Sequence, residues 1–121
     1  MYDHPNNVVR REVITGHITG AAGASMQKFQ FFQAAKLRKV HAQVVTAGTN
    51  AAAAVDVYVG TVSVGSLAFG TNTAGTILHT AALNTTIPQN GYVELKGIAN
   101  SATLVGAFNL EYDVTHDSTQ S

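Results

Sequence analysis

Apolar and polar residues alternate along much of this chain, and glycine, asparagine and proline interrupt the alternation at intervals. The longest alternating segment is TLVGAFNLEYDV, residues 103–114, in which every second position is apolar or small. Asn109, Glu111 and Asp113 occupy positions between the apolar ones. A period of two residues is typical of a β-strand with one buried face. We therefore predict a strand over 103–114.

Further segments show the same period or are short apolar runs bounded by glycine. They are 12–19, 26–32, 36–47, 55–59, 61–70, 73–83 and 92–96. A helix over 33–39 is the local alternative, because QAAKLRK contains good helix formers. We favour a strand–turn–strand arrangement, with Ala34-Ala35 near the turn. In the second strand this places Arg38 on the same face as Val40.

The stretch TIPQNGYVEL, residues 86–95, contains the clearest bend in the chain. Pro88 begins the bend, and Asn90-Gly91 supplies two residues that tolerate positive φ at low cost. An apolar segment ends at Ile87, and another starts at Tyr92. The bend therefore predicts a tight turn between two strands.

About eight strands, spaced roughly ten residues apart, indicate an all-β fold. We predict a single-domain antiparallel β-sandwich, jelly-roll-like, because 121 residues fit one domain. The sandwich is expected over 12–115. Residues 1–11 are expected to form an extended N-terminal arm, because nothing periodic precedes Val8. The polar residues 116–121 are expected to form a flexible C-terminal tail.

The composition is poor in charge: 45% of the residues are hydrophobic and only 12% are charged. That is about half the charged fraction of an average globular chain. A surface of threonine, asparagine, serine and alanine suits a chain that packs against neighbouring protein. No apolar run approaches the ~20 residues of a membrane span, and the N-terminus lacks a signal-peptide apolar segment. We expect a soluble product made in the cytoplasm, without membrane contact.

The net charge is zero, but basic residues concentrate before Asn50 and acidic residues after it. If the fold separates these halves, one face is basic and another acidic, which favours head-to-tail contacts. A β-sandwich usually interleaves its two halves instead. The charge pattern leaves both arrangements open.

Catalytic and metal-binding patterns are thin. The five histidines lack zinc-ligand spacing, and there are no cysteines to form disulfides or thiolate sites. Asp56, Glu94, Glu111 and Asp113 fall on predicted outward positions, and the cluster 113–117 lacks the oxygen spacing of a calcium loop. No serine has a nucleophile-elbow context, and no glycine cluster has the lysine of a phosphate loop. We predict no enzymatic activity, no cofactor and no metal.

Two short stretches are candidates for contacts with other molecules. The basic run Lys36-Leu37-Arg38-Lys39 could bind nucleic acid, but a net charge of zero favours a protein partner. Phe31 and Phe32 must face opposite ways in a strand, so one of them leaves the core. An exposed aromatic residue of this kind marks either a subunit contact or a covering loop.

Three stretches carry a family resemblance: DVYVGTVSVGSLAFGTNTAGT, ALNTTIPQNGYVELKGIANSAT and VGAFNLEYDV. They resemble the decoration (cement) proteins of tailed-bacteriophage heads and other small virion structural subunits, over roughly residues 36–114. The resemblance implies an all-β, non-enzymatic protein, made in the host cytoplasm, that binds the major capsid protein on the outside of an icosahedral shell. It also implies homotrimers at symmetry positions, with terminal arms that reach neighbouring subunits.

An arm with Arg10-Arg11 suits a protein of this kind, because such an arm can anchor the chain to a lattice of partners. The predicted capsid or subunit contacts are Arg10, Arg11, Phe31, Phe32, Lys36, Arg38 and Lys39. The alternative function is a carbohydrate-binding β-sandwich of a phage tail or fibre. Tryptophan is absent, and only Tyr58 and Tyr92 are plausible outward aromatic residues for a sugar platform.

Overall fold

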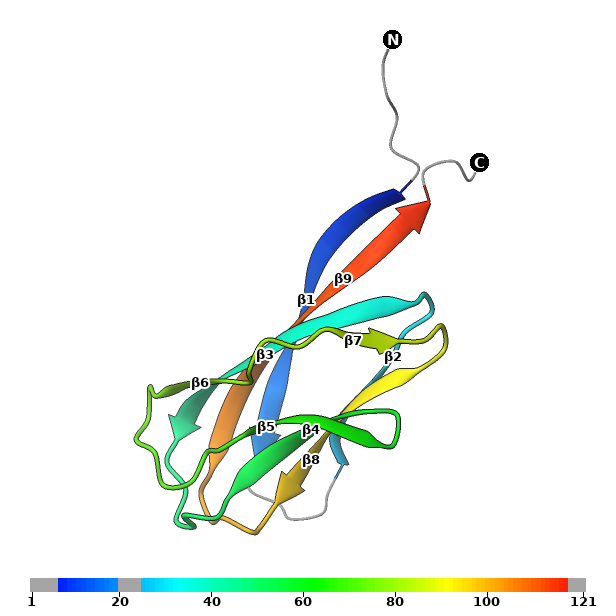
Figure 1. Cartoon of the computed structure of the whole chain (residues 1–121). Coiled ribbons are helices and arrows are strands. Elements are labelled where there is room, and N and C mark those ends of the chain that lie inside the picture. Colours follow the sequence, from blue (N-terminus) through cyan, green and yellow to red (C-terminus); the bar gives the residue numbers. More distant parts are fainter. Residues whose placement is uncertain (1–6, 20–24, 118–121) are drawn as a thin grey trace.

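The computed structural model describes residues 7–19 and 25–117, and these residues form nine β-strands in two antiparallel sheets (Figure 1). The strands are β1 (Asn7–Thr19), β2 (Ser25–Gln30), β3 (Ala35–Thr46), β4 (Ala54–Val59), β5 (Val62–Leu67), β6 (Ile77–His79), β7 (Thr85–Ile87), β8 (Tyr92–Ile98) and β9 (Val105–Asp117). No helix occurs in these ranges, so none there could cross a membrane.

The first sheet has five strands in the order β1-β9-β3-β6, with β7 also paired to β3. The second has four strands in the order β2-β8-β4-β5. Only β4 and β5 pair as a hairpin; at most other steps the chain crosses from one sheet to the other. This wrapping is that of a jelly roll. The predicted all-β antiparallel sandwich is therefore confirmed. The sequence predicted about eight strands, and the strand that it missed is β7. With three residues, β7 is too short for a period of two to be recognised.

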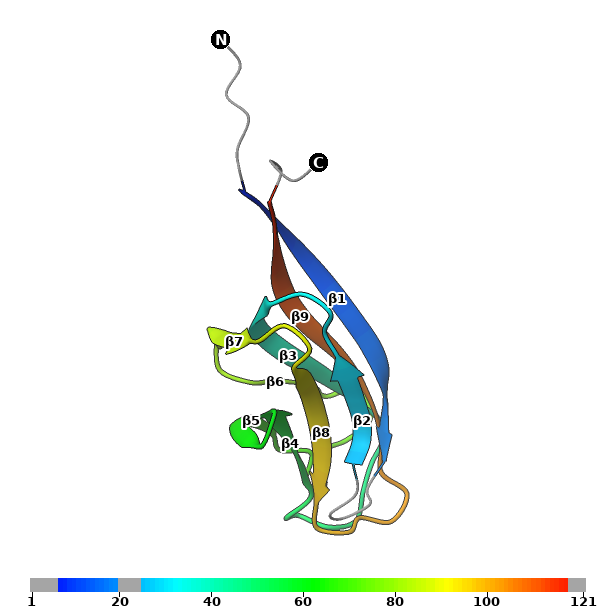
Figure 2. The same cartoon turned by 90° about the vertical axis from the view of Figure 1, so that its right-hand side faces the viewer.

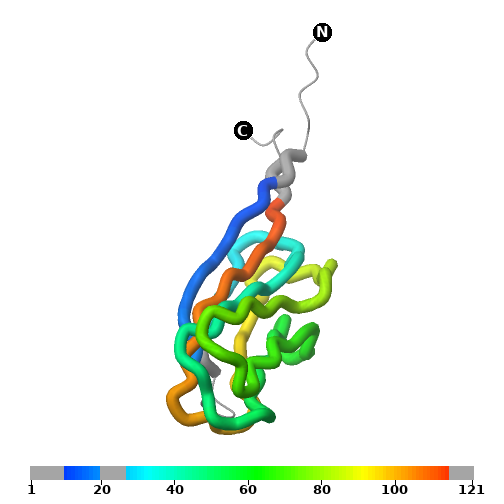
Figure 3. The backbone as a smooth tube through the Cα atoms, turned by 90° about the vertical axis from the view of Figure 1, so that its left-hand side faces the viewer, coloured from blue at the N-terminus to red at the C-terminus, as the bar shows by residue number. Residues whose placement is uncertain are grey.

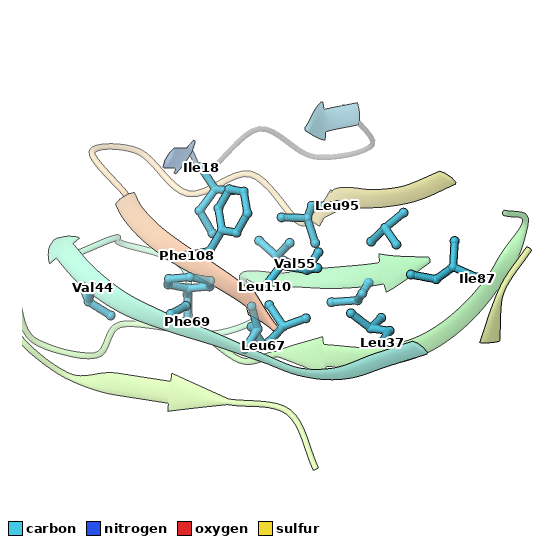
Figure 4. Packing of buried hydrophobic residues seen from close by; sticks show 14 of the residues in the cluster. Ile18, Leu37, Val44, Val55, Leu67, Phe69, Ile87, Leu95, Phe108 and Leu110 are labelled. Carbon is cyan, nitrogen blue, oxygen red and sulfur yellow. The ribbon is translucent and has the colours of Figure 1, made fainter. Parts of the chain in front are cut away.

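The core lies between the two sheets, where their inward side chains meet (Figure 4). Ten labelled residues are at most 2% exposed: Ile18, Leu37, Val44, Val55, Leu67, Phe69, Ile87, Leu95, Phe108 and Leu110. Gly106 of β9 leaves room for the ring of Phe69, because a Cβ there would lie 2.7 Å from Phe69 Cε1. The alternation predicted for 103–114 is confirmed, with the apolar set on the core side.

The predicted face of Arg38 is wrong, because the pairing of β3 with β9 shifts register between Leu37 and Lys39. This bulge places two consecutive side chains, Arg38 and Lys39, away from the core. Leu37 and Val40 on either side are both fully buried. No helix forms over 33–39, and β3 begins at Ala35.

The predicted boundaries of the arm and tail need correction. Residues 7–11 belong to β1 and pair with 113–117 of β9, so the sandwich begins at Asn7 and includes His116 and Asp117. Main-chain pairing with β9 holds residues 7–11 in the sheet. The β1–β9 ribbon extends beyond the rest of the sandwich (Figure 1). Residues 1–6 and 118–121, the remainder of the predicted arm and tail, lie outside the described residues.

Candidate contact surface at one end of the five-stranded sheet

Strand pairing brings three separated stretches of sequence to one end of the five-stranded sheet. Arg11 of β1 lies opposite Asp113 of β9, and Asp113 lies opposite Lys36 of β3. The β2–β3 turn, which carries Phe31 and Phe32, leads directly into this end of β3 (Figure 2). We call it the contact end. It holds all the candidate residues: Arg10, Arg11, Phe31, Phe32, Lys36, Arg38 and Lys39.

The turn at 88–91 positions Phe31. The Gly91 amide donates to the Pro88 carbonyl at 2.8 Å, and Asn90 has a φ of 63°. Positive φ at the third residue is characteristic of a type II turn. Phe31 is tied to this turn twice: its amide donates to Gly91 O at 2.8 Å, and its carbonyl accepts from the Asn90 amide at 2.7 Å.

Phe31 and Phe32 do face opposite ways. Phe31 is 7% exposed and packs edge-on against Tyr112, with ring centroids 4.9 Å apart. Phe32 is 77% exposed, the largest exposure among the large hydrophobic residues of the described chain. No loop within the described ranges covers Phe32, so a covering loop from these residues does not explain its exposure. The Phe32 ring is an exposed apolar group that a partner could contact.

Polar groups of β1 and β9 surround the two phenylalanines. The Tyr112 hydroxyl donates to Glu12 at 3.2 Å, and burial and the nearby Glu12 carboxylate raise the pKa of Tyr112. Arg10 pairs with Glu12 at 3.5 Å and keeps 62% of its side chain exposed. A hollow of about 200 Å³ lies among these groups; its lining is Arg10, Glu12, Phe31, Phe32, Gln33, Tyr112 and Val114.

The outer face of the contact end carries an ion-pair network across β1, β9 and β3. Arg11 binds Asp113 and, at 3.1 Å, Glu111, while Arg38 lies 3.4 Å from Asp113. Arg38 also donates to Asn84 at 2.6 Å. The Arg11 hydrogen bond to Asp113, together with the charges of both arginines, holds the pKa of that carboxyl below its usual range. The same carboxylate raises the pKa of Arg11.

This network decides between the two charge arrangements that the sequence left open. β9 is acidic and lies between the more basic β1 and β3, so opposite charges interleave on this sheet. The side chains of Arg11 and Arg38 are therefore already engaged in ion pairs within the chain. Lys36 and Lys39 form no ion pair with any described residue, so they are the cations available to a partner. Lys36 also lines an open groove of about 620 Å³, with Gln33, Ala34, Ala35, Thr86, Gln89 and Asp113.

The outer face of the four-stranded sheet holds the two candidate sugar-binding tyrosines. The Lys96 ammonium lies 4.9 Å from the ring centroid of Tyr58, and Lys28 lies 4.1 Å from that of Tyr92. Glu94 was predicted to be an outward, solvated acid. It faces outward between Lys28 and Tyr58, but only 10% of its side chain is exposed, because these longer neighbours cover it.

Other chemical groupings are sparse in the part of the chain that the structure describes. His41 binds Glu111 at 2.6 Å, and its ring lies 6.3 Å from that of His79. No set of three or more metal-ligating side chains is close enough to hold an ion within 7–19 and 25–117. Sequence reasoning missed Glu12 and Gln33, which complete the hollow beside Phe32. No local pattern marks Glu12, because it reaches the hollow only through the pairing of β1 with β9, whereas Gln33 directly follows Phe32 in the β2–β3 turn.

No protein-family model matches the chain. No curated protein matches it either. Among solved structures, it resembles a chain in the acidic stable capsid structure of Helicobacter pylori bacteriophage KHP30. That match has a TM-score of 0.57 and 12% identity, over 91% of this chain and 98% of that one. This likeness shows the fold alone.

Weaker matches include carbohydrate-binding module CBM36 in complex with calcium and xylotriose. For CBM36 the TM-score is 0.43 at 17% identity, over 91% of this chain and 98% of that chain. For a chain of the cyanophage Pam1 capsid asymmetric unit it is 0.42 at 18% identity, over 94% and 91%.

Proposed function

We propose that this chain is a non-enzymatic virion structural protein that binds the outer surface of an icosahedral phage head and stabilises it, as decoration proteins do. The exposed ring of Phe32 carries the proposal. It stands at the contact end beside the exposed Arg10. Lys36, which has no ion-pair partner among the described residues, lies at the start of β3, just after the turn that carries Phe32. The likeness of fold to a chain of the KHP30 capsid structure supports it.

The partner in this proposal is the major capsid protein. Burying a phenylalanine side chain contributes about 1.5–3 kcal/mol, so Phe32 would anchor the contact in an apolar pocket. Lys36 and Lys39 would face acidic groups of the shell. Repetition over a symmetric lattice strengthens contacts that are individually modest. The predicted homotrimer would place three such ends around one symmetry position.

Replacing Phe32 separates binding from folding. F32A should bind heads about tenfold or more weakly, because the buried ring is lost. Its free energy of unfolding should stay within about 0.5 kcal/mol of wild type, because the ring is exposed in the free protein. Co-sedimentation with purified heads measures the first quantity, and urea unfolding measures the second.

Val62 offers a matched control, since it is 63% exposed but lies on β5 of the other sheet. V62A should bind heads as wild type does. Head binding by F32A at the wild-type level would contradict the proposed role of the contact end.

A carbohydrate-binding module is the second candidate, favoured by one observation. Tyr58 and Tyr92 share the outer face of the four-stranded sheet with Glu94, as aromatic and acidic groups do on sugar platforms. Lys28 and Lys96 would have to leave the rings for a sugar to stack. A glycan array with wild type and Y58A/Y92A tests this function; binding that depends on the two tyrosines would favour it.

A further inference from the structure

β1 is an unusually long and regular free edge. It is the outermost strand of the five-stranded sheet and pairs with β9 over thirteen consecutive residue pairs, without a register shift. The other edge strands are short or irregular. β6 and β7 have three residues each, and β2 and β5 have six residues each with a shifted register.

Proteins normally blunt free edges with short strands, bulges or prolines, because unpaired main-chain groups recruit another strand. Among the described residues, only the end of β1 near the β1–β2 connection is covered: Gln27 Nε2 donates to the His17 carbonyl at 3.2 Å. From Asn7 to Thr15, no main-chain group of β1 bonds to a described segment other than β9. Part of this open stretch lies on the ribbon that extends past the rest of the sandwich (Figure 1), and β1 runs along the outer border of the molecule beside β9 (Figure 3).

We propose that the open edge of β1 pairs antiparallel with β1 of a second copy of this chain, across a two-fold axis at residue 11. Arg10 and Glu12 lie on the same face of β1 and 3.5 Å apart. An axis at residue 11 places Arg10 opposite Glu12 of the partner subunit, and the reverse contact repeats it. Opposite charges in directly facing positions stabilise an antiparallel pair.

The charge pattern selects this register. An axis at residue 12 would put Glu12 against the partner's Glu12, and an axis at residue 10 would put Arg10 against the partner's Arg10. Like charges in facing positions are destabilising. In the proposed register the two Arg11 residues meet on the other face, but each is already bound by Asp113 and Glu111 of its own chain.

A second copy is the occupant that this pattern favours, because the edge is complementary to itself. A two-fold contact also agrees with the predicted trimer, since it would join one trimer to the next. The inference needs only the chain itself and does not depend on head binding. Its failure is therefore distinguishable from the failure of the proposed function.

Charge reversal tests the pairing by sedimentation velocity over a range of concentrations. R10E and E12R should each weaken two-fold association about tenfold or more, because two attractive contacts become repulsive in each dimer. An equimolar mixture of R10E and E12R chains should associate again, because every facing pair is then opposite in charge. K96E is the control. It changes the net charge as R10E does, but it lies on β8, which pairs with β2 on one side and β4 on the other and so has no free edge.

Cross-linking gives a second readout that does not depend on affinity. The chain has no cysteine, so mixed R10C and E12C chains should form a disulfide-linked heterodimer under mild oxidation. A mixture of K96C and E12C chains is the control, and it should not form the disulfide link efficiently. Association of R10E at the wild-type level, failure of the mixture to restore it, or a monomeric wild type without the R10C–E12C link would each overturn the proposal.

Discussion

At the scale of single residues, the bend at 88–91 depends on two residues for different reasons. Asn90 takes up the positive φ that its side chain tolerates. Gly91 is required for a different reason: a Cβ there would lie 2.8 Å from the Pro88 carbonyl oxygen. The sequence predicted the turn and its residues, but not this close approach or the two hydrogen bonds to Phe31.

Substitutions at Asn90 test this account of the turn. N90A should lower the free energy of unfolding by about 1 kcal/mol, because alanine is strained at positive φ. N90G should stay within a few tenths of a kcal/mol of wild type, because glycine adopts that conformation freely. Urea unfolding of the three proteins measures both effects. Equal stability of N90A and wild type would mean that the turn is not held as described.

At the scale of elements, the alternating period predicted most strands, but the pairing between strands depended on features that no local pattern reveals. The bulge near Arg38 turned two cationic side chains outward, and β7 was too short to recognise. Asp113 then links three strands by binding Arg11 of β1 and Arg38 of β3. Along the chain, Arg11 lies 102 residues and Arg38 lies 75 residues before Asp113, so no local pattern could have predicted these ion pairs.

The lowered pKa of Asp113 predicts a pH dependence of stability. Because the folded-state pKa lies below the unfolded value of about 3.9, the unfolded chain takes up this proton first as the pH falls. The contribution of Asp113 is therefore present above about pH 4 and is lost as the pH falls through the folded pKa. Urea unfolding should show a shallower loss of stability on acidification for D113N than for wild type.

D56N is a suitable control for that experiment, because Asp56 lies on the other sheet and forms no ion pair with any described residue. It should keep the wild-type slope between neutral and acid pH. Identical slopes for D113N and wild type would show that the ion pairs with Arg11 and Arg38 contribute nothing to the acid response.

At the scale of the whole molecule, the jelly-roll wrapping creates the contact end. The sequence predicted the sandwich and named the candidate residues, but it could not place them together, because that requires the pairing of β9 with both β1 and β3. The same pairing neutralises Arg11 and Arg38 and leaves Phe32, Lys36 and Lys39 as the groups open to a partner. Residues 1–6, the outer part of the predicted arm, lie outside this comparison.

The most direct test of head decoration is the copy number of this chain in purified virus particles. It should be quantified against the major capsid protein, and the purified chain should then be added to heads that lack it. The proposal predicts copies on the order of hundreds, as repetition over a symmetric shell requires, and saturable binding to the bare heads. A handful of copies per particle, or no binding to heads, would contradict it.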